Sequence, residues 1–246
     1  MSPRARAQLF FAITVILALV FVRLGLWQVS RLRERRAANR AALAAREAAP
    51  AVLGDSTRPT NARTLGDHRI MIEGEYDFGG ELVLRGQSAG GVPGVRVVTP
   101  LRPLGGDTAI LVQRGFVPAP DAQTVDLAPL REEGIVRVTA IGFLLPDTAV
   151  SGEPREKDGR TTWRRIDLAA VRRQLGYPVS QLLALQLPDP GLPAVPRRDP
   201  PATLDDGPHL SYAVQWFSFA LTAVVIGSIV LVQGLRSKVP GGKGKV

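Results

Sequence analysis

A histidine followed by two aromatic residues is the most chemically suggestive feature of this sequence of 246 residues. His209, Tyr212 and Trp216 open a long apolar segment, and their spacing places them near one face of a helix. A neutral imidazole can ligate haem iron, and aromatic neighbours can cover the face of a porphyrin. The residues alone favour the plainer interpretation, which is an interfacial histidine bonded to lipid headgroups or to the apolar segment at residues 8–29.

Other catalytic patterns in the chain lack the context that their chemistry requires. Residues 86–90 read GQSAG and match the G-x-S-x-G pattern of hydrolases, but GVPG follows where that motif needs a helix. A hairpin loop is therefore expected there. Phosphate-binding glycine motifs are absent from the sequence, and the adjacent acids at 132–133 and 205–206 are expected to be solvated in turns. No enzymatic activity is predicted, because no acid, base and nucleophile converge.

The composition restricts metal and redox chemistry. The chain contains no Cys, two His and two Met. Disulfides, thiolate zinc sites, iron–sulfur clusters and c-type haem attachment are therefore excluded. A copper chaperone needs thiolate, thioether or imidazole ligands in number, and this sequence does not supply them. No site for a separate metal ion is predicted.

The basic residues do not indicate a nucleic-acid partner. The chain has 31 Lys+Arg against 22 Asp+Glu, which gives a formal net charge of +9. The arginines at residues 30–49 adjoin an apolar segment and have no interleaved aromatic residues, so nucleic-acid binding is not predicted. A solvated or headgroup-facing helix is expected there, and contacts to anionic lipid, worth ~1 kcal/mol per residue, are the second interpretation.

Two apolar segments are long enough to cross a lipid bilayer. Residues 8–29 reach the roughly 20 residues of a span only by including Arg23, which costs ~3 kcal/mol unless it snorkels. Residues 210–235 contain no charge, and interfacial aromatic residues mark one end of each segment. A cleaved signal peptide is the rival interpretation of the first segment, but arginine-rich sequence separates it from the A-x-A-like site at 42–44. A retained anchor is predicted.

The region between the spans is predicted to form a mostly antiparallel β domain, as a sandwich or an open barrel, with one short helix. Its apolar residues alternate in short runs between glycine-rich turns. The predicted strands are residues 68–76, 81–85, 95–99, 109–117, 135–145 and 179–187, with prolines 100 and 118 ending the third and fourth. Asp167 and Gly176 are predicted to cap the helix between them. The fold class is therefore an α+β membrane protein with two transmembrane helices.

Four motifs resemble those of the Surfeit locus protein 1 family. They are LGLWQVSR at 24–31, GVRVVTP at 94–100, LVQRGFVP at 111–118, and HLSY at 209–212 followed by Trp216. They occur in the family's order over nearly the whole chain. The resemblance implies an assembly factor, not an enzyme, for a haem–copper terminal oxidase (cytochrome c oxidase) of the respiratory chain. It also implies a bacterial inner-membrane protein with cytoplasmic termini and a periplasmic central domain, although counting arginines near the spans would place that domain inside.

With that orientation the chain divides into seven predicted segments. They are a cytoplasmic N-terminus (1–7), transmembrane helix 1 (8–29), a juxtamembrane helix (30–49), an extracytoplasmic β-rich domain (50–187), a Pro-rich return linker (188–208), transmembrane helix 2 (209–235) and a basic cytoplasmic tail (236–246).

The resemblance further implies that the protein helps haem a reach or remain in oxidase subunit I. Its expected partners are subunit I, other oxidase assembly proteins and the lipid bilayer. The histidine that matches His209 is the family's proposed haem contact. Tyr212, Trp216 and Trp27 are predicted to flank a transiently bound haem a, and Arg31 or nearby arginines to pair with its propionates. The alternative is a scaffold that stabilises subunit I without binding haem.

The third motif contains an arginine and a glycine that suggest structural roles. Arg114 is predicted to form an ion pair, and Gly115 to adopt a backbone conformation that suits glycine. Presentation of a surface to a partner protein is the alternative.

Overall fold

The computed structural model describes residues 2–53, 62–146, 154–157 and 160–236, which form two compact units. The helical unit comprises Met1–Ala41 and Leu204–Val246, and the barrel unit comprises Ala42–Thr203. The predicted basic tail beyond residue 236 and residues 54–61 of the predicted extracytoplasmic domain lie outside the described residues.

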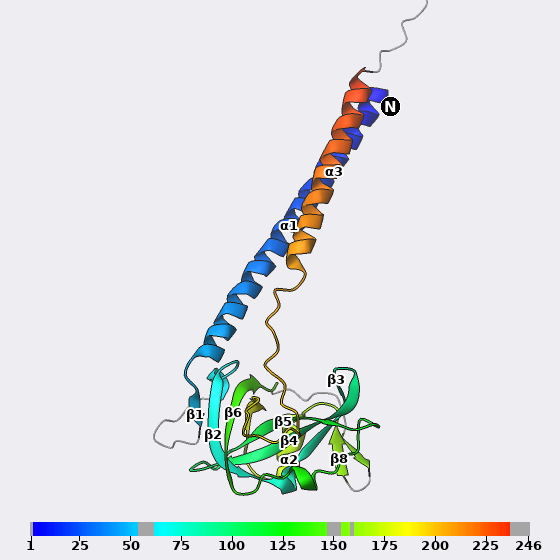
Figure 1. Ribbon diagram of the computed structural model, residues 1–246. Coiled ribbons are helices and arrows are strands. Elements are labelled where there is room, and N and C mark those ends of the chain that lie inside the picture. The colour runs from blue at the N-terminus through cyan, green and yellow to red at the C-terminus, as the bar shows by residue number, and fades with distance from the viewer. Residues whose placement is uncertain (1, 54–61, 147–153, 158–159, 237–246) are drawn as a thin grey trace, which may run out of the picture. The chain divides into compact units, whose positions relative to one another are not determined.

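Two helices dominate the helical unit (Figure 1). They are α1 (Pro3–Glu47) and α3 (His209–Arg236), and each is long and apolar enough to cross a membrane. α1 continues without a break from its apolar part into the arginine-rich residues that follow. Along both helices most large apolar side chains are exposed, as expected for surfaces that meet lipid or other apolar segments rather than water.

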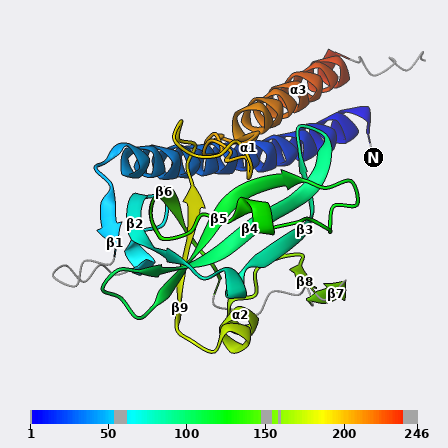
Figure 2. The same ribbon diagram turned by 60° about the horizontal axis from the view of Figure 1, so that its bottom comes forward.

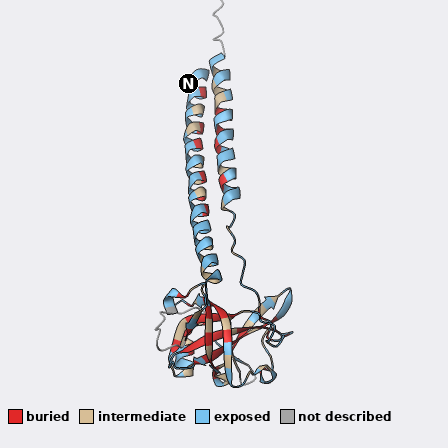
Figure 3. Ribbon diagram, turned by 60° about the vertical axis from the view of Figure 1, so that its left-hand side comes forward, coloured by how far each residue is buried: buried red, intermediate tan, exposed pale blue. Residues whose placement is uncertain are grey.

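α1 and α3 run antiparallel and pack through small residues. Ala7 near the start of α1 meets Gly234 near the end of α3, and Thr14 meets Gly227. A Cβ on either glycine would collide with its neighbour on α1, so the missing side chains set the distance between the helices. Figure 3 shows the buried stripes on the two helices. The buried residues of α3 are Ala213, Ala220, Ala223 and Gly227.

Five strands of the barrel unit close into a barrel, in the order β2-β6-β9-β5-β4 with β2 also paired to β4 (Figure 2). Their pairings are antiparallel except for the parallel pair β5–β9. The strands are β2 (Arg69–Tyr76), β4 (Val92–Pro103), β5 (Ala109–Pro118), β6 (Ile135–Leu144) and β9 (Val179–Gln186).

Shorter elements extend the sheet beyond the barrel. The strand β3 (Leu82–Ala89) pairs with β4, and β1 (Ala51–Leu53) adds to β2 in parallel. The outermost strands are β8 (Arg160–Trp163) and β7 (Arg155–Lys157). The unit also contains α2 (Leu168–Leu175) and the 3₁₀ turns η1 (Ala62–Thr64), η2 (Phe78–Gly80) and η3 (Ala128–Leu130).

The predicted mostly β domain with one short helix is confirmed, and its barrel is closed rather than open. Closure depends on β4, which pairs with β3 up to Val98 and then with β2 from Leu101 onward. Pro100 lies inside β4, so the prediction that it ends the strand is wrong. The carbonyl of Pro100 accepts from the N–H of Asp77, so this edge of the residue faces the gap between β3 and β2. A proline is tolerated there because no neighbouring strand requires an N–H from it.

The capping residues of α2 are confirmed. The Asp167 carboxylate accepts from the N–H of Ala170, and Gly176 adopts a left-handed conformation with φ of 72°. The helix packs Val171 against Trp163 and Leu82 in one apolar cluster, while a second cluster fills the barrel.

A buried arginine joins several strands and turns of the barrel unit. The Arg114 guanidinium is fully buried, 3.3 Å from Glu81 Oε1 and 2.8 Å from Glu132 Oε1. It also donates to the carbonyl of Leu130. Burial raises the pKa of the Glu81 carboxyl, although Thr99 and Arg114 donate to it. The predicted structural ion pair is therefore present, and it compensates a carboxylate that is costly to bury.

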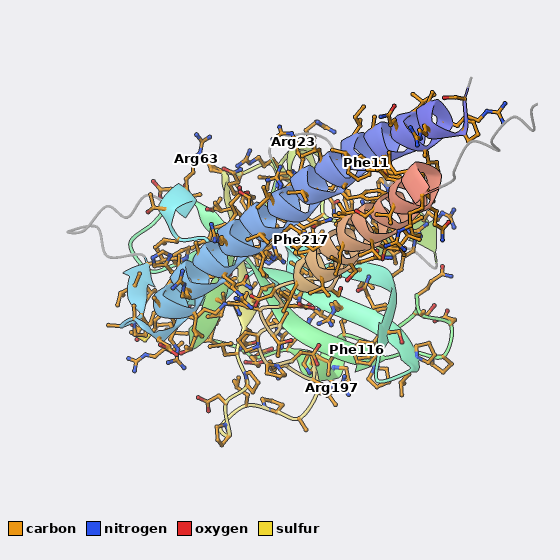
Figure 4. The ribbon with its side chains drawn as sticks, turned by 90° about the horizontal axis from the view of Figure 1, so that it is seen from above. Phe11, Arg23, Arg63, Phe116, Arg197 and Phe217 are labelled. Carbon is orange, nitrogen blue, oxygen red and sulfur yellow. The ribbon has the colours of Figure 1, made fainter. Side chains whose placement is uncertain are left out.

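The same cluster fixes the proline-rich segment onto the barrel. Arg198 donates to Glu132 Oε1 at 2.9 Å, and the backbones of Arg197 and Phe116 exchange two hydrogen bonds of 2.7 and 2.8 Å. The Arg197 guanidinium also lies 5.4 Å from the centroid of the Phe116 ring (Figure 4). Residues 193–199 are thus part of the barrel unit rather than a free linker.

Gly115 is required where the proline-rich segment crosses β5. Its φ is +137°, and a Cβ there would lie 2.5 Å from the carbonyl oxygen of Arg197. Both the backbone conformation and the close approach exclude a side chain.

Replacing Arg114 tests the buried cluster. We expect Arg114→Met to lower the free energy of unfolding by about 3–5 kcal/mol, because Glu81 loses its cationic partner in a buried site. Arg137→Met is the control, since the Arg137–Glu73 pair is exposed (68% and 41%) and should cost less than about 1 kcal/mol. Urea unfolding of the detergent-solubilised protein, followed by tryptophan fluorescence, measures both. Equal losses would contradict a central role for the cluster.

A glycine pair tests the crossing at β5. Gly115→Ala should destabilise the protein by about 2 kcal/mol or more, through both strain and contact with Arg197. Gly134→Ala is the matched control, because Gly134 also has a positive φ (+81°) but open space around it. The same unfolding measurement applies, and a Gly134→Ala variant as unstable as Gly115→Ala would show that the contact with Arg197 contributes nothing.

Candidate functional site

The helical unit brings a histidine and a glutamine together across its two helices. His209 is the first residue of α3, and its Nδ1 lies 2.9 Å from Oε1 of Gln28 on α1. Gln28 is buried in the stripe of α1 residues that faces α3, and His209 is half-buried. The two residues are 181 positions apart in the sequence, so only the pairing of the helices makes this contact.

An ionic clamp holds the segment before His209 against α1. Asp206 Oδ2 accepts from Arg36 Nε at 2.8 Å, and its Oδ1 accepts from the Asn39 amide at 3.3 Å. The carbonyl of Asp205 accepts from Asn39 at 3.1 Å and from Arg35 at 3.2 Å. The expectation that these acids are merely solvated is wrong, because α1 carries their partners on the turns that face them.

A tight turn then directs the chain into α3. Gly207 has a φ of 72°, and its N–H donates to Oδ1 of Asp205 at 2.5 Å. Pro208 supplies the carbonyl that accepts from the N–H of Tyr212 and from the hydroxyl of Ser211. The clamp and the turn together fix where the His209 ring lies.

The clamp also sets the charge state of its carboxylate. The hydrogen bond from Arg36 lowers the pKa of Asp206 below its ordinary value. Asp206 is ionised at neutral pH like any aspartate, and the lowered pKa keeps it ionised, and attracted to Arg36, to a lower pH than usual.

The predicted aromatic neighbours of His209 are split between two surroundings. Trp216 is turned toward α1, where its ring stacks on Phe21 with centroids 5.7 Å apart and meets Phe219 edge-on at 5.9 Å. Tyr212 is 47% exposed. His209 and Trp216 therefore share the face of α3 that packs on α1, and Tyr212 lies beside that face.

Trp27 and Arg31 lie on the outer surface of α1. Trp27 is 51% exposed, and the Arg31 guanidinium lies 5.8 Å from the centroid of its ring. Arg31 also pairs with Glu34 at 2.8 Å, with both side chains exposed. Trp27 lines a hollow with four other α1 residues, and Arg23 on its rim projects from the side of α1 away from α3 (Figure 4). The lining residues are Arg23, Leu24, Leu26, Trp27 and Ser30.

Comparison with known proteins identifies the family. The sequence model described as the SURF1 family matches residues 15–221, which is most of the chain and contains all four motifs. The chain belongs to the SURF1 family. A SURF1-like protein of Monosiga brevicollis is 25% identical over 235 residues, which cover 88% of this chain and 87% of that protein. The SURF1 family is known generally for oxidase assembly factors, and the resemblance found in the four motifs is confirmed.

Within this SURF1 chain the first motif contains a residue whose role the sequence reasoning missed. Gln28 belongs to LGLWQVSR, in which roles were predicted only for Trp27 and Arg31. The available signal is a spacing of seven, because Ala7, Thr14 and Gln28 fall on one heptad position of α1. A glutamine in an apolar stripe requires a polar partner, and His209 provides it.

The barrel unit of this SURF1 chain offers no metal-binding cluster among its described residues. Groups of three or more His, Cys, Asp or Glu that could hold a metal ion do not occur in the described parts of the chain. The GQSAG stretch lies in β3 and its hairpin to β4, where Gly90 and Gly91 have φ of 61° and 80°. The expected hairpin is confirmed, and the strand–turn–helix of a hydrolase is not formed there.

The clamp yields a testable expectation. Asp206→Asn removes the charge that Arg36 holds, so amide hydrogen exchange in residues 204–210 should become faster at pH 7 in the solubilised protein. Asp107→Asn, a change of the same kind at an exposed turn of the barrel unit, should leave that exchange unchanged.

The pH dependence of the clamp follows from the lowered pKa. A carboxyl whose pKa is lowered in the fold stabilises it above its ordinary value of about 3.9, and that contribution is lost as the pH falls through the lowered value. In the wild type the clamp should therefore hold from neutral pH down to about pH 4 and release below it. Amide hydrogen exchange in residues 204–210 that is as slow in Asp206→Asn as in the wild type at pH 7 would contradict the clamp.

Proposed function

We propose that this chain is a membrane-anchored assembly factor for a haem–copper terminal oxidase, and that it helps haem a reach or remain in subunit I. Membership of the SURF1 family and the two long apolar helices support this proposal. The proposed location is a bacterial inner membrane, with both termini in the cytoplasm and the barrel unit outside. The proposed partners are subunit I, other oxidase assembly proteins and the bilayer.

The observation that carries the haem proposal is the position of His209. Its Nδ1 is engaged with Gln28, while its Nε2 has no hydrogen-bond partner among the residues that the structure describes. An imidazole held in this way is a suitable axial donor to iron, which is the chemistry that a bound haem a would supply. The donor set of the helical unit therefore fits the group.

The surroundings of His209 suit an apolar ligand that carries an acidic group. Leu210 and Val214 are 55% and 59% exposed on α3. Their apolar side chains can therefore pack against the face of a macrocycle. We assign Tyr212, Trp216 and Trp27 to flanking positions in this layer. Arg31 is the proposed partner of a propionate, because its exposed pair with Glu34 can be exchanged at little cost.

The proposed role is binding and positioning rather than catalysis. The half-buried acids Glu81 and Glu132 of the barrel unit are paired with Arg114 and Arg198, which leaves them poorly suited to proton transfer. The barrel unit is thus proposed as a surface for oxidase subunits and other assembly proteins.

Replacing His209 tests the haem proposal. We expect His209→Ala to reduce by roughly tenfold or more the haem a that copurifies with the full-length protein from haem-a-producing cells, because the axial donor is lost. His68→Ala is the matched control, since His68 belongs to the barrel unit and bonds the carbonyl of Gly66. Absorption spectra of the detergent-solubilised proteins measure the haem content.

The alternative function predicts a different result. Equal haem content in the wild type and His209→Ala would remove haem handling by His209. If His209→Ala also restored oxidase activity in a strain lacking the protein, a scaffold that stabilises subunit I without binding haem would be the better description.

A further inference from the structure

We propose that Gln28 is a positioning residue that fixes the tautomer of His209, so that Nδ1 carries the proton and the Nε2 lone pair is free for iron. This inference rests on the proposed haem function and deepens it. The function requires an imidazole donor, and the inference states which residue prepares that donor.

The direction of the hydrogen bond follows from which Gln28 atom contacts the ring. Oε1 of Gln28 lies 2.9 Å from Nδ1 of His209, and a carbonyl oxygen can only accept. Nδ1 must then donate, and a neutral ring that is protonated at Nδ1 has its lone pair on Nε2. A carbonyl acceptor behind a metal-binding imidazole is the common arrangement in metalloproteins, because it orients the ring and strengthens the opposite nitrogen as a donor.

The burial of Gln28 indicates a specific role. Only 9% of this residue is exposed, and it occupies a stripe otherwise made of small or apolar residues such as Gly25 and Leu32. A leucine would fill the same position without the cost of burying an amide.

A second observation concerns the opposite edge of the imidazole. The position of a Cβ on Gly207 would be 3.5 Å from Cδ2 and 3.7 Å from Nε2 of His209. Because Gly207 has no side chain, it places no side-chain atom against this edge of the ring. The ring is therefore held at Nδ1, and Nε2 has neither a hydrogen-bond partner nor a Gly207 side chain against it among the described residues.

The chemical character of the acceptor matches a transient carrier. A carboxylate behind the imidazole would strengthen the iron bond more than a neutral amide does, because it accepts the proton more strongly. A neutral amide orients the ring and yet leaves the bond from Nε2 to iron of moderate strength. A protein that must pass its haem to another subunit needs that balance.

The experiment compares the wild type and two Gln28 variants with one control variant, all full-length and in detergent. Gln28→Leu keeps the size and removes the acceptor, Gln28→Glu keeps an acceptor and strengthens it, and Gln8→Leu makes the same chemical change at an exposed α1 position. The first readout is independent of haem. Nitrogen NMR of [¹⁵N]histidine-labelled protein, at a pH where the ring is neutral and with His68→Gln to simplify the spectrum, identifies the tautomer of His209.

We expect the wild type and Gln8→Leu to show the Nδ1–H tautomer and Gln28→Leu to lose this preference. The second readout is binding of hemin. Its affinity should fall by roughly 10- to 100-fold in Gln28→Leu and remain at or above the wild-type value in Gln28→Glu, with a lower midpoint potential in Gln28→Glu. A merely structural glutamine predicts no loss in Gln28→Leu, since leucine suits the apolar stripe. Circular dichroism during heating verifies that each variant keeps its helices.

Two results would overturn the inference. One is an Nε2–H tautomer in the wild type, and the other is hemin binding by Gln28→Leu with unchanged affinity and potential. Neither affects the proposed function if His209→Ala still loses haem. Conversely, if His209→Ala binds hemin as tightly as the wild type, the proposed function fails, and the NMR measurement still decides whether Gln28 sets the tautomer.

Discussion

The close approach of α1 and α3 is the constraint on which the candidate site depends. Glycines and alanines on α3 let its backbone reach α1, and larger residues at Gly227 or Gly234 would separate the helices. Only at this distance does the Gln28 amide meet the His209 ring. The site is therefore a product of helix packing, and the ionic clamp at Asp206 secures one end of it.

In the barrel unit the main constraint is the burial of charged side chains. Arg114 lies where strands and turns converge, and two carboxylates compensate it. One of these, Glu132, also binds Arg198 of the proline-rich segment, so a single carboxylate joins the barrel to the chain that leads toward α3. The motif around Arg114 and Gly115 is explained by this internal junction, because neither residue is available to a partner protein.

Features governed by local sequence could be predicted, whereas features governed by distant contacts could not. Alternating apolar residues gave β2, β5, β6 and β9 nearly to their ends, and Asp167 and Gly176 marked α2 because caps act within a few residues. Closure through β2 and β4, the partners of Arg114 and the Gln28–His209 contact all join distant residues, so no local pattern encodes them. The prediction for Pro100 fails for the same reason, since a proline is tolerated inside a strand only where the strands beside it leave its missing N–H without a partner.

The place of β9 in the barrel affects how the chain is made. β9 comes last of the strands in the sequence, yet it lies between β5 and β6. Until the ribosome has synthesised residues 179–186, those two earlier strands have open edges with unsatisfied backbone groups. Barrel closure is therefore a late event of high contact order, and the nascent polypeptide passes through a stage that is prone to aggregation before its final helix emerges.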